Sequence, residues 1–183
     1  VTQYQAVEIA GKATEYTQAY LASISHTDAM IGQVLEALAL SPYAGKTDII
    51  VWSDHGFHLG EKFHWRKLTF WEQAVKVPLL VSSPGNPDYP VGDVIEEVSL
   101  IDLAATVVDL AGLSPVGQFE GAPLHDAANR SPAEIYLNDG MATVDNRIKV
   151  IDYDLHTRGR SDRSSYDLVS DPGELVNLPP PGC

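Results

Sequence analysis

A chain of 183 residues with 44% apolar and 20% charged residues has the composition of a folded globular protein and not of a disordered tail. Its formal net charge of −13 argues against binding to nucleic acid or to an anionic membrane surface, although a local positive pocket could still bind a small anion. No apolar run approaches the length of a membrane span, and the single cysteine, Cys183, excludes an intrachain disulfide.

The first 113 residues alternate between helical and strand patterns. Residues 5 to about 39 lack proline and repeat apolar residues three and four positions apart, which predicts an amphipathic helix. Residues 47–53 (TDIIVWS) and 77–85 (VPLLVSSPG) are typical of strands buried on both faces. Residues 99–113 (SLIDLAATVVDLAGL) predict a helix with Ser99 as N-cap and Gly112 as its end. This order predicts an α/β protein with a mainly parallel sheet flanked by helices.

The chain becomes rich in loops after Leu113. Short strands are expected at 133–139 (AEIYLND) and 146–154 (NRIKVIDYD), and the end of the chain is expected to be exposed. We therefore expect two parts: an α/β domain over residues 1–113, and a small α+β subdomain with a tail over residues 114–183.

Titratable residues gather directly behind the first predicted strand. They are Asp54, His55, His58, Glu61, Lys62, His64, Arg66 and Lys67. Ligand sites of α/β sheets lie beyond the carboxyl ends of the strands, where Asp54 and His55 are placed. A carboxylate and an imidazole there could bind Ca²⁺, Mg²⁺ or Mn²⁺. The alternative is that Asp54 caps the next turn and His55 is partly buried.

Four stretches resemble, in this order and spacing, the second half of a sulfatase of the alkaline phosphatase superfamily. They are residues 20–38 (YLASISHTDAMIGQVLEAL), 47–85, 98–113 and 164–178 (SSYDLVSDPGELVNL). The centre is most similar to the iduronate-2-sulfatase-like branch, in which an Asp-His pair is followed by a Gly-Glu turn and a Trp-x-Lys. The resemblance implies a partial alkaline phosphatase-like fold, with residues 1–113 as the C-terminal part of the catalytic domain.

The resemblance implies roles for several of these residues. Asp54 and His55 match two ligands of the family's divalent metal, usually calcium. Lys67 matches the lysine that contacts the sulfate ester, where a compact ammonium can neutralise developing negative charge. His64, as a catalytic group, and His58, as a substrate contact, lie in the same loop, and a structural role stays open for both.

Residues outside that loop are expected to be structural or are left open. Glu72 is expected to pair within the loop or with a neighbouring helix. The stretch at 171–174 (DPGE) is similar to the family's DP-x-E signature, which closes a turn. Arg147 and Lys149 fall on a predicted strand, but the sequence does not show which face they occupy.

The chain departs from the family pattern in one respect that concerns the mechanism. It has neither the early Asp-Asp pair for the metal nor the Cys-x-Pro-x-Arg or Ser-x-Pro-x-Arg stretch whose first residue becomes formylglycine, the attacking group. No residue follows Cys183, and Asn86 stands where the Ser82 stretch would require arginine. The formylglycine is therefore expected on an N-terminal half that is cleaved, on another chain or absent.

Three functions remain open. The first is a sulfuric ester hydrolase acting on a sulfated small molecule or saccharide, inactive without the N-terminal half. The second is a phosphonate monoester or phosphodiester hydrolase of the same superfamily, against which the Trp65-x-Lys67 pattern argues. The third is a non-catalytic fragment.

Two further expectations follow from the resemblance. A half of such a fold should expose a large apolar face that another polypeptide covers. The family resemblance also favours a periplasmic or secreted location, with any export signal preceding residue 1.

Overall fold

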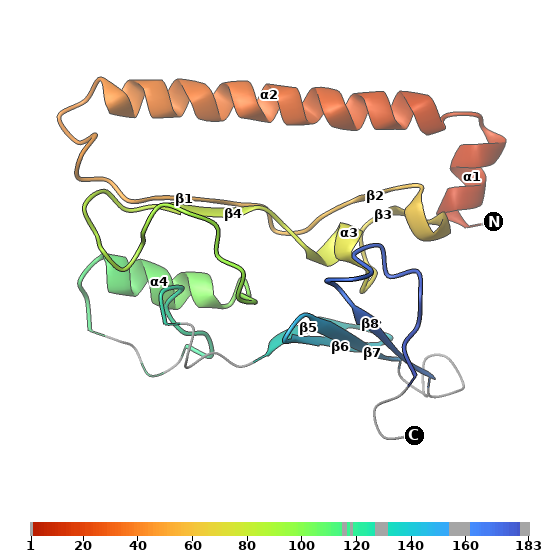
Figure 1. The fold of residues 1–183 in the computed structure, drawn as a ribbon. Helices are drawn as coiled ribbons and strands as arrows, with labels where there is room; N and C mark the ends of the chain where they lie inside the picture. Colours follow the sequence, from red (N-terminus) through yellow and green to blue (C-terminus); the bar gives the residue numbers. More distant parts are fainter. Residues whose placement is uncertain (1, 115–116, 118, 127–131, 154–161, 180–183) are drawn as a thin grey trace.

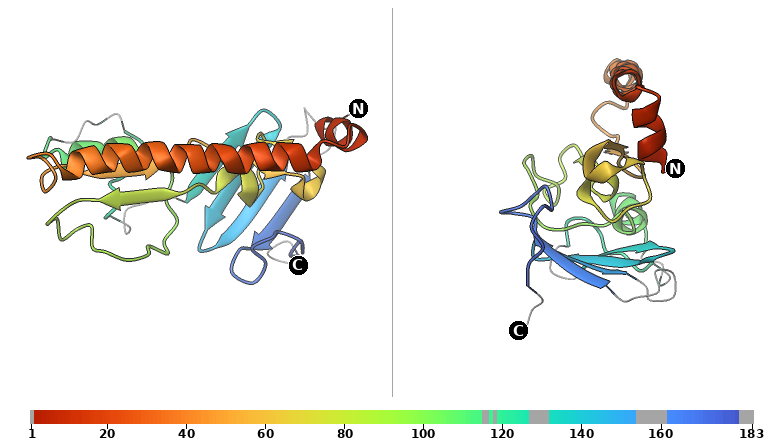
Figure 2. Two further views of the ribbon diagram at one scale, coloured as in Figure 1. Left: turned by 90° about the horizontal axis from the view of Figure 1, so that it is seen from above. Right: turned by 90° about the vertical axis from the view of Figure 1, so that its right-hand side faces the viewer.

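The computed structural model describes residues 2–114, 117, 119–126, 132–153 and 162–179. They form three layers (Figure 1): a long helix on the outside, a middle layer that contains a two-stranded sheet and a long loop, and a lower layer with a short helix and a four-stranded sheet. The end-on view of Figure 2 shows the loop between the long helix and the four-stranded sheet.

The predicted N-terminal helix is two helices. Helix α1 (Gln3–Ile9) begins with a capping box in which Thr2 Oγ1 accepts from the amide of Gln5. Gly11, with φ +63°, breaks the helix in a conformation that glycine tolerates best. Helix α2 (Ala13–Ala39) then runs for 27 residues and buries none of them within the described part of the chain.

Strand β1 (Ile49–Trp52) pairs with β4 (Leu79–Ser82) in an antiparallel two-stranded sheet. The segment between them contains β2 (His58–Leu59), the 3₁₀ turn η1 (Glu61–Phe63), β3 (Trp65–Arg66) and α3 (Glu72–Val75). This segment brings the chain back beside β1 without the long crossover helix that parallel pairing requires.

The structure therefore corrects two predictions for this region. The described part of the chain contains antiparallel strand pairs only, and no mainly parallel sheet. Neither β1 nor β4 is buried on both faces, because Trp52 is 53% exposed and Leu80 is 60% exposed.

Helix α4 (Asp102–Leu110) follows β4 at some distance and ends before Gly112, as predicted. The predicted N-cap is wrong, because Ser99 does not cap the helix through its side chain. Instead, Asp102 Oδ2 accepts from the amide of Ser99 at 3.0 Å, and Asp102 Oδ1 accepts from Ala122 at 3.0 Å. The carboxylate thereby ties the start of α4 to the loop that follows it.

The C-terminal part is an antiparallel meander of four strands, β5 to β8 in sequence order. The strands are β5 (Ala133–Leu137), β6 (Gly140–Asp145), β7 (Ile148–Tyr153) and β8 (Asp162–Asp167). The buried cluster of the molecule forms where Phe70, from the loop before α3, packs on Ala142, Ile151 and Tyr166 of this sheet. The four-stranded sheet is thus the support on which that loop rests.

The expected boundary between residues 113 and 114 lies near the end of α4 and stays a prediction. Cys183 lies outside the described residues. No helix in the described ranges is both long and apolar enough to cross a bilayer.

Candidate active site

The residues predicted to form the site lie on one loop, residues 53–71, which we call the site loop. It leaves the end of β1 and doubles back beneath α2. Its first turn is fixed where the amide of Gly56 donates to Ala74 O at 2.8 Å. A Cβ on Gly56 would lie 2.1 Å from Gln73 O, so this close approach of two backbones requires glycine.

Asp54, His55 and Lys67 converge in the structure. His55 Nδ1 lies 2.8 Å from Gly56 O, a carbonyl that can only accept, so we assign the ring proton to Nδ1. The lone pair of Nε2 then faces outward, 3.5 Å from Asp54 Oδ2 and 2.6 Å from Lys67 Nζ. The two side chains that the sequence suggested as metal ligands therefore do not point to opposite sides.

This pair fits a divalent metal in its chemistry. Asp54 offers a hard oxygen, and His55 has the arrangement typical of a metal-binding histidine, with the far ring nitrogen held by a carbonyl. The described residues contain no group of three or more candidate ligands. Two side chains do not complete a calcium shell, which takes six to eight oxygens, so the remaining ligands would have to come from elsewhere.

Lys67 lies on a strained part of the site loop. Its neighbours Arg66 and Leu68 have φ of +78° and +70°, and Lys62 and Phe63 both have φ of +55°. Each such conformation costs a non-glycine residue about 1–3 kcal/mol and persists only where the surroundings enforce it. His64 Nε2 lies 3.0 Å from Lys67 O, so this imidazole contacts the lysine backbone from within the loop.

His58 is fully buried in the site loop. Its Nε2 lies 2.7 Å from Thr69 Oγ1, and its ring packs edge-on against His64 with centroids 5.1 Å apart. Burial lowers the pKa of His58, and the nearby His64 lowers it further. Of the two roles left open for His58, this position favours the structural one.

Three aromatic pairs hold the other side of the site loop. Each pair joins one tyrosine of helix α1 or α2 to an aromatic residue of the site loop, with ring centroids 5.2–6.0 Å apart. The pairs are Tyr4–Phe63, Tyr16–Trp65 and Tyr20–Phe57. The loop is thus packed between the N-terminal helices and the C-terminal sheet.

A cavity of about 710 Å³ lies beside this site. Asp54, His55 and Lys67 line it together with Glu72, and residues 94–101 and 133–137 also contribute to its lining. The three converging groups are therefore open to a ligand-sized space.

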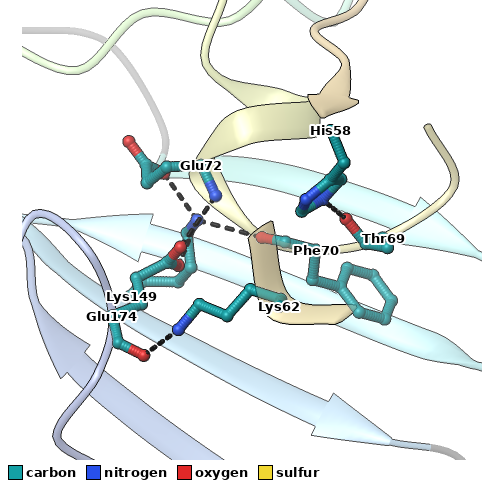
Figure 3. Close-up of polar contacts among 7 residues, drawn as sticks. All are labelled: His58, Lys62, Thr69, Phe70, Glu72, Lys149 and Glu174. Atoms are coloured by element: carbon teal, nitrogen blue, oxygen red, sulfur yellow. Dashed lines mark hydrogen bonds and ion pairs between the residues drawn. The ribbon is translucent and has the colours of Figure 1, made fainter. Parts of the chain in front are cut away.

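A buried charge cluster beneath the site loop was missed from the sequence (Figure 3). Lys149 Nζ lies 2.7 Å from Glu174 Oε1 and 2.5 Å from Glu72 Oε1, and it donates to Phe70 O at 3.0 Å. The alternation of β7 could have indicated it, because Lys149 shares the inward face of that strand with the core residue Ile151. The expectation that Glu72 pairs within its loop or with a neighbouring helix is wrong, because Glu72 pairs with Lys149 of strand β7.

The sequence profile of the sulfatase family matches residues 2–113, and the chain therefore belongs to this family. A sulfatase of Formosa agariphila is 34% identical over 170 residues, which cover 91% of this chain and 33% of that protein. Human arylsulfatase K is 31% identical over 177 residues, which cover 87% of this chain and 32% of that protein. The chain thus spans about a third of the length of these two relatives.

Solved structures share the fold. The structure of BT4656 in complex with its substrate D-glucosamine-2-N,6-O-disulfate matches with a TM-score of 0.73 and 25% identity, over 92% of this chain and 37% of that one. Phosphonate monoester hydrolase of Agrobacterium radiobacter matches with a TM-score of 0.69 and 25% identity, over 84% and 35%. The fold is therefore shared by a protein solved with a sulfated sugar and by a phosphonate monoester hydrolase.

Proposed function

We propose that this chain supplies the metal and sulfate-ester contacts of a sulfuric ester hydrolase, most like the iduronate-2-sulfatase branch. The observation that carries the proposal is the convergence of Asp54 Oδ2, His55 Nε2 and Lys67 Nζ beside a cavity of about 710 Å³. The family match supports the class of reaction.

In this proposal each group has a defined task. Asp54 and His55 would hold a divalent cation, calcium above magnesium or manganese, which supplies Lewis-acid polarisation of the sulfate oxygens. Lys67 places its ammonium on an ester oxygen and neutralises charge that develops there. His64 contacts the backbone of Lys67 and so helps to hold that ammonium in place.

The attacking group would come from outside this chain. We propose an N-terminal half, on the same polypeptide before cleavage or on another chain, that carries formylglycine and further metal ligands. The open edges of the β1–β4 pair support this, since an isolated two-stranded sheet is marginal in water. Exposed apolar side chains such as Val34 of α2 and Leu80 of β4, at 68% and 60%, also support it.

We propose a sulfated saccharide or small molecule as the substrate and a periplasmic or secreted location. The disulfated glucosamine named with the structural neighbour supports a sugar ligand. The acidic chain argues against a nucleic-acid ligand, and Lys67 supplies a local positive group for a small anion.

The similarity to a phosphonate monoester hydrolase favours one alternative function, hydrolysis of phosphonate monoesters or phosphodiesters. The same Asp54, His55 and Lys67 arrangement can face a phosphoryl oxygen, because the charge and tetrahedral shape are alike. A non-catalytic fragment is the third possibility, and it would bind no metal.

The Lys67 side chain provides the test. In the complete protein, Lys67→Ala should lower kcat for an aryl sulfate by roughly a hundredfold or more, because a preorganised charge is lost from the transition state. Lys67→Arg should also be impaired, since a planar guanidinium does not replace a compact ammonium. Steady-state kinetics measures both effects, with thermal melting as the check on folding.

Lys46→Ala is the matched control, because Lys46 is an exposed lysine on the turn before β1. It should keep wild-type turnover. Equal activity of all four proteins would remove Lys67 from the site and contradict the proposed role of this chain.

A further inference from the structure

We infer that Lys149, Glu72 and Glu174 are positioning residues that hold the site loop in its active geometry. The catalytic consequence rests on the proposed function, whereas the structural consequence does not. Lys149 and Glu174 have fully buried side chains, and the side chain of Glu72 is 16% exposed. The cluster joins the start of β7, the start of α3 and the turn that follows β8.

Stability alone is a weak reason for such a cluster. Removing charges from water costs several kcal/mol for each ion, and well-packed apolar residues of the same volume often stabilise a core equally well. Charged groups differ from apolar ones in that they fix direction through hydrogen bonds. The role of this cluster therefore depends on which backbone groups its charged side chains bind.

The cluster binds the backbone at the end of the site loop. Lys149 Nζ donates to Phe70 O at 3.0 Å, and Glu174 Oε2 accepts from the amide of Glu72 at 2.8 Å. Both bonds act on the stretch that leads from Lys67 into α3. The carbonyl and the amide are thus held by two groups that come from the C-terminal sheet and its tail.

The fixed stretch in turn supports the proposed metal ligands. Ala74 O accepts from the amide of Gly56 at 2.8 Å, and Gly56 follows directly on Asp54 and His55. Gly56 O also holds the ring of His55. Glu174 is therefore connected to His55 through hydrogen bonds to the backbone of Glu72, Ala74 and Gly56. The cluster does not need to contact Asp54 or His55 directly.

A second contact from the same turn reaches the strained part of the loop. Lys62 Nζ donates to the backbone carbonyl of Glu174 and lies 4.3 Å from the ring centroid of Trp71 (Figure 3 shows the first contact). Lys62 itself has a positive φ, as have Phe63, Arg66 and Leu68. A strained loop relaxes when its anchors are removed, so the loss of Glu174 should free the segment that carries Lys67.

The test uses the complete protein and two variants, Glu174→Gln and Lys149→Met. Hydrogen exchange of the Gly56 amide is the readout, because this amide does not contact the cluster but depends on the stretch that the cluster holds. We expect exchange at Gly56 and at Gly60 to be faster by about tenfold or more, with the amides of β5 and β6 unchanged. A uniform acceleration at all these amides, or none at Gly56, would overturn the inference.

Asp152→Asn is the matched control, because Asp152 also lies on β7 but forms an exposed pair with Arg163, 3.4 Å apart. It should leave exchange at Gly56 unchanged. Where Lys149→Met fails to fold, Glu72→Ala replaces it, since Glu72 is the least buried member and its loss removes one carboxylate from Lys149, with the same faster exchange at Gly56 expected.

Kinetics on a sulfate ester separates this inference from the proposed function. In an active complete protein, Glu174→Gln should lower kcat by about tenfold or more with KM within about twofold, because misplaced groups lose transition-state contacts. An inactive wild type with local loosening at Gly56 would contradict the proposed function and keep the positioning role. An active wild type with unchanged kcat in Glu174→Gln would overturn the positioning role alone.

Discussion

His55 owes its orientation to one local contact. The carbonyl of the next residue, Gly56, holds Nδ1 and leaves Nε2 to face Asp54 and Lys67. A sequence can place an Asp-His pair at a strand end, and here it did. It cannot show which ring nitrogen is free, because that depends on the path of a backbone carbonyl through a turn.

The sequence also left the roles of His58 and His64 open, for a physical reason. Both lie within seven residues of one another in the same loop, with similar neighbours. Their difference arises from packing across the loop, which buries His58 against Thr69 and leaves His64 half-buried. Such contacts between residues eleven positions apart have no periodic signal in the sequence.

The buried state of His58 predicts an acid-sensitive stability. Its pKa lies below the ordinary value of 6.5, chiefly because burial disfavours the charged ring. Above pH 6.5 the ring is neutral in both the folded and the unfolded state. Below it the unfolded chain binds a proton that the folded chain does not, so stability falls as the pH decreases from 6.5.

His58→Gln should therefore flatten the melting temperature of the complete protein between pH 7 and pH 5. His26→Gln is the control, because His26 is exposed on α2 and should keep the wild-type slope. Identical slopes in all three proteins would contradict the buried neutral state of His58.

At the scale of elements, the hydrophobic periodicity and the turn residues of the sequence predicted the positions of several helices and strands. Helix α2 up to its end, β1, β4 and α4 were placed to within a few residues from periodicity and stop signals such as Gly112, whereas the break at Gly11 that separates α1 from α2 was not predicted. Strands β6 and β8 were not predicted. Their sequences mix polar and apolar residues, as in GMATVD, and their stability comes from pairing with neighbours in the meander.

Strand direction was not predictable in the same way. The parallel sheet was expected from the order of strands and helices along the chain, which does not show how residues 53–77 connect β1 to β4. The segment instead contains short elements, ties its ends together through the Gly56–Ala74 bond and returns the chain antiparallel to β1. Direction here depends on a long-range contact and not on the strand sequences.

The Gly56 turn is the element that a single methyl group should disrupt. Gly56→Ala places a Cβ 2.1 Å from Gln73 O, and neither backbone can yield without breaking the 2.8 Å bond to Ala74. We expect a loss of about 1–3 kcal/mol of unfolding free energy, measured by urea denaturation.

Gly45→Ala is the comparison, since no atom lies within 4 Å of a Cβ built at Gly45. Its unfolding free energy should stay within about 0.5 kcal/mol of wild type. A Gly56→Ala protein as stable as Gly45→Ala would show that the two backbones are not in contact.

At the scale of the whole molecule, the described residues form an open assembly of layers and not a closed globule (Figure 2). Helix α2 buries none of its residues, and Trp52 and Leu80 of the two-stranded sheet are more than half exposed. Trp52 pairs with Leu79 and Leu80 with Val51, so the two exposed side chains lie on opposite faces of this sheet. Exposed apolar side chains favour a surface that another polypeptide covers. The family resemblance predicted such an apolar face, and for the face that carries Leu80 its cover stays a prediction.

Chemical labelling tests whether that face is covered in the complete protein. A thiol at Leu80→Cys should react with iodoacetamide about tenfold or more slowly than one at Asp88→Cys, because reaction requires access. Asp88 is the control, as it lies on the exposed loop after β4. The wild-type rate accounts for Cys183, and equal rates at the two new sites would contradict a covering segment.

Ester selectivity of the complete protein tests the central claim most directly. Initial rates are measured on 4-nitrophenyl sulfate and on a 4-nitrophenyl phosphonate monoester under the same conditions. If Asp54, His55 and Lys67 belong to a sulfatase site, kcat/KM for the sulfate should exceed that for the phosphonate by about tenfold or more. A preference for the phosphonate would assign the site to the alternative hydrolase, and hydrolysis of neither ester would contradict the account.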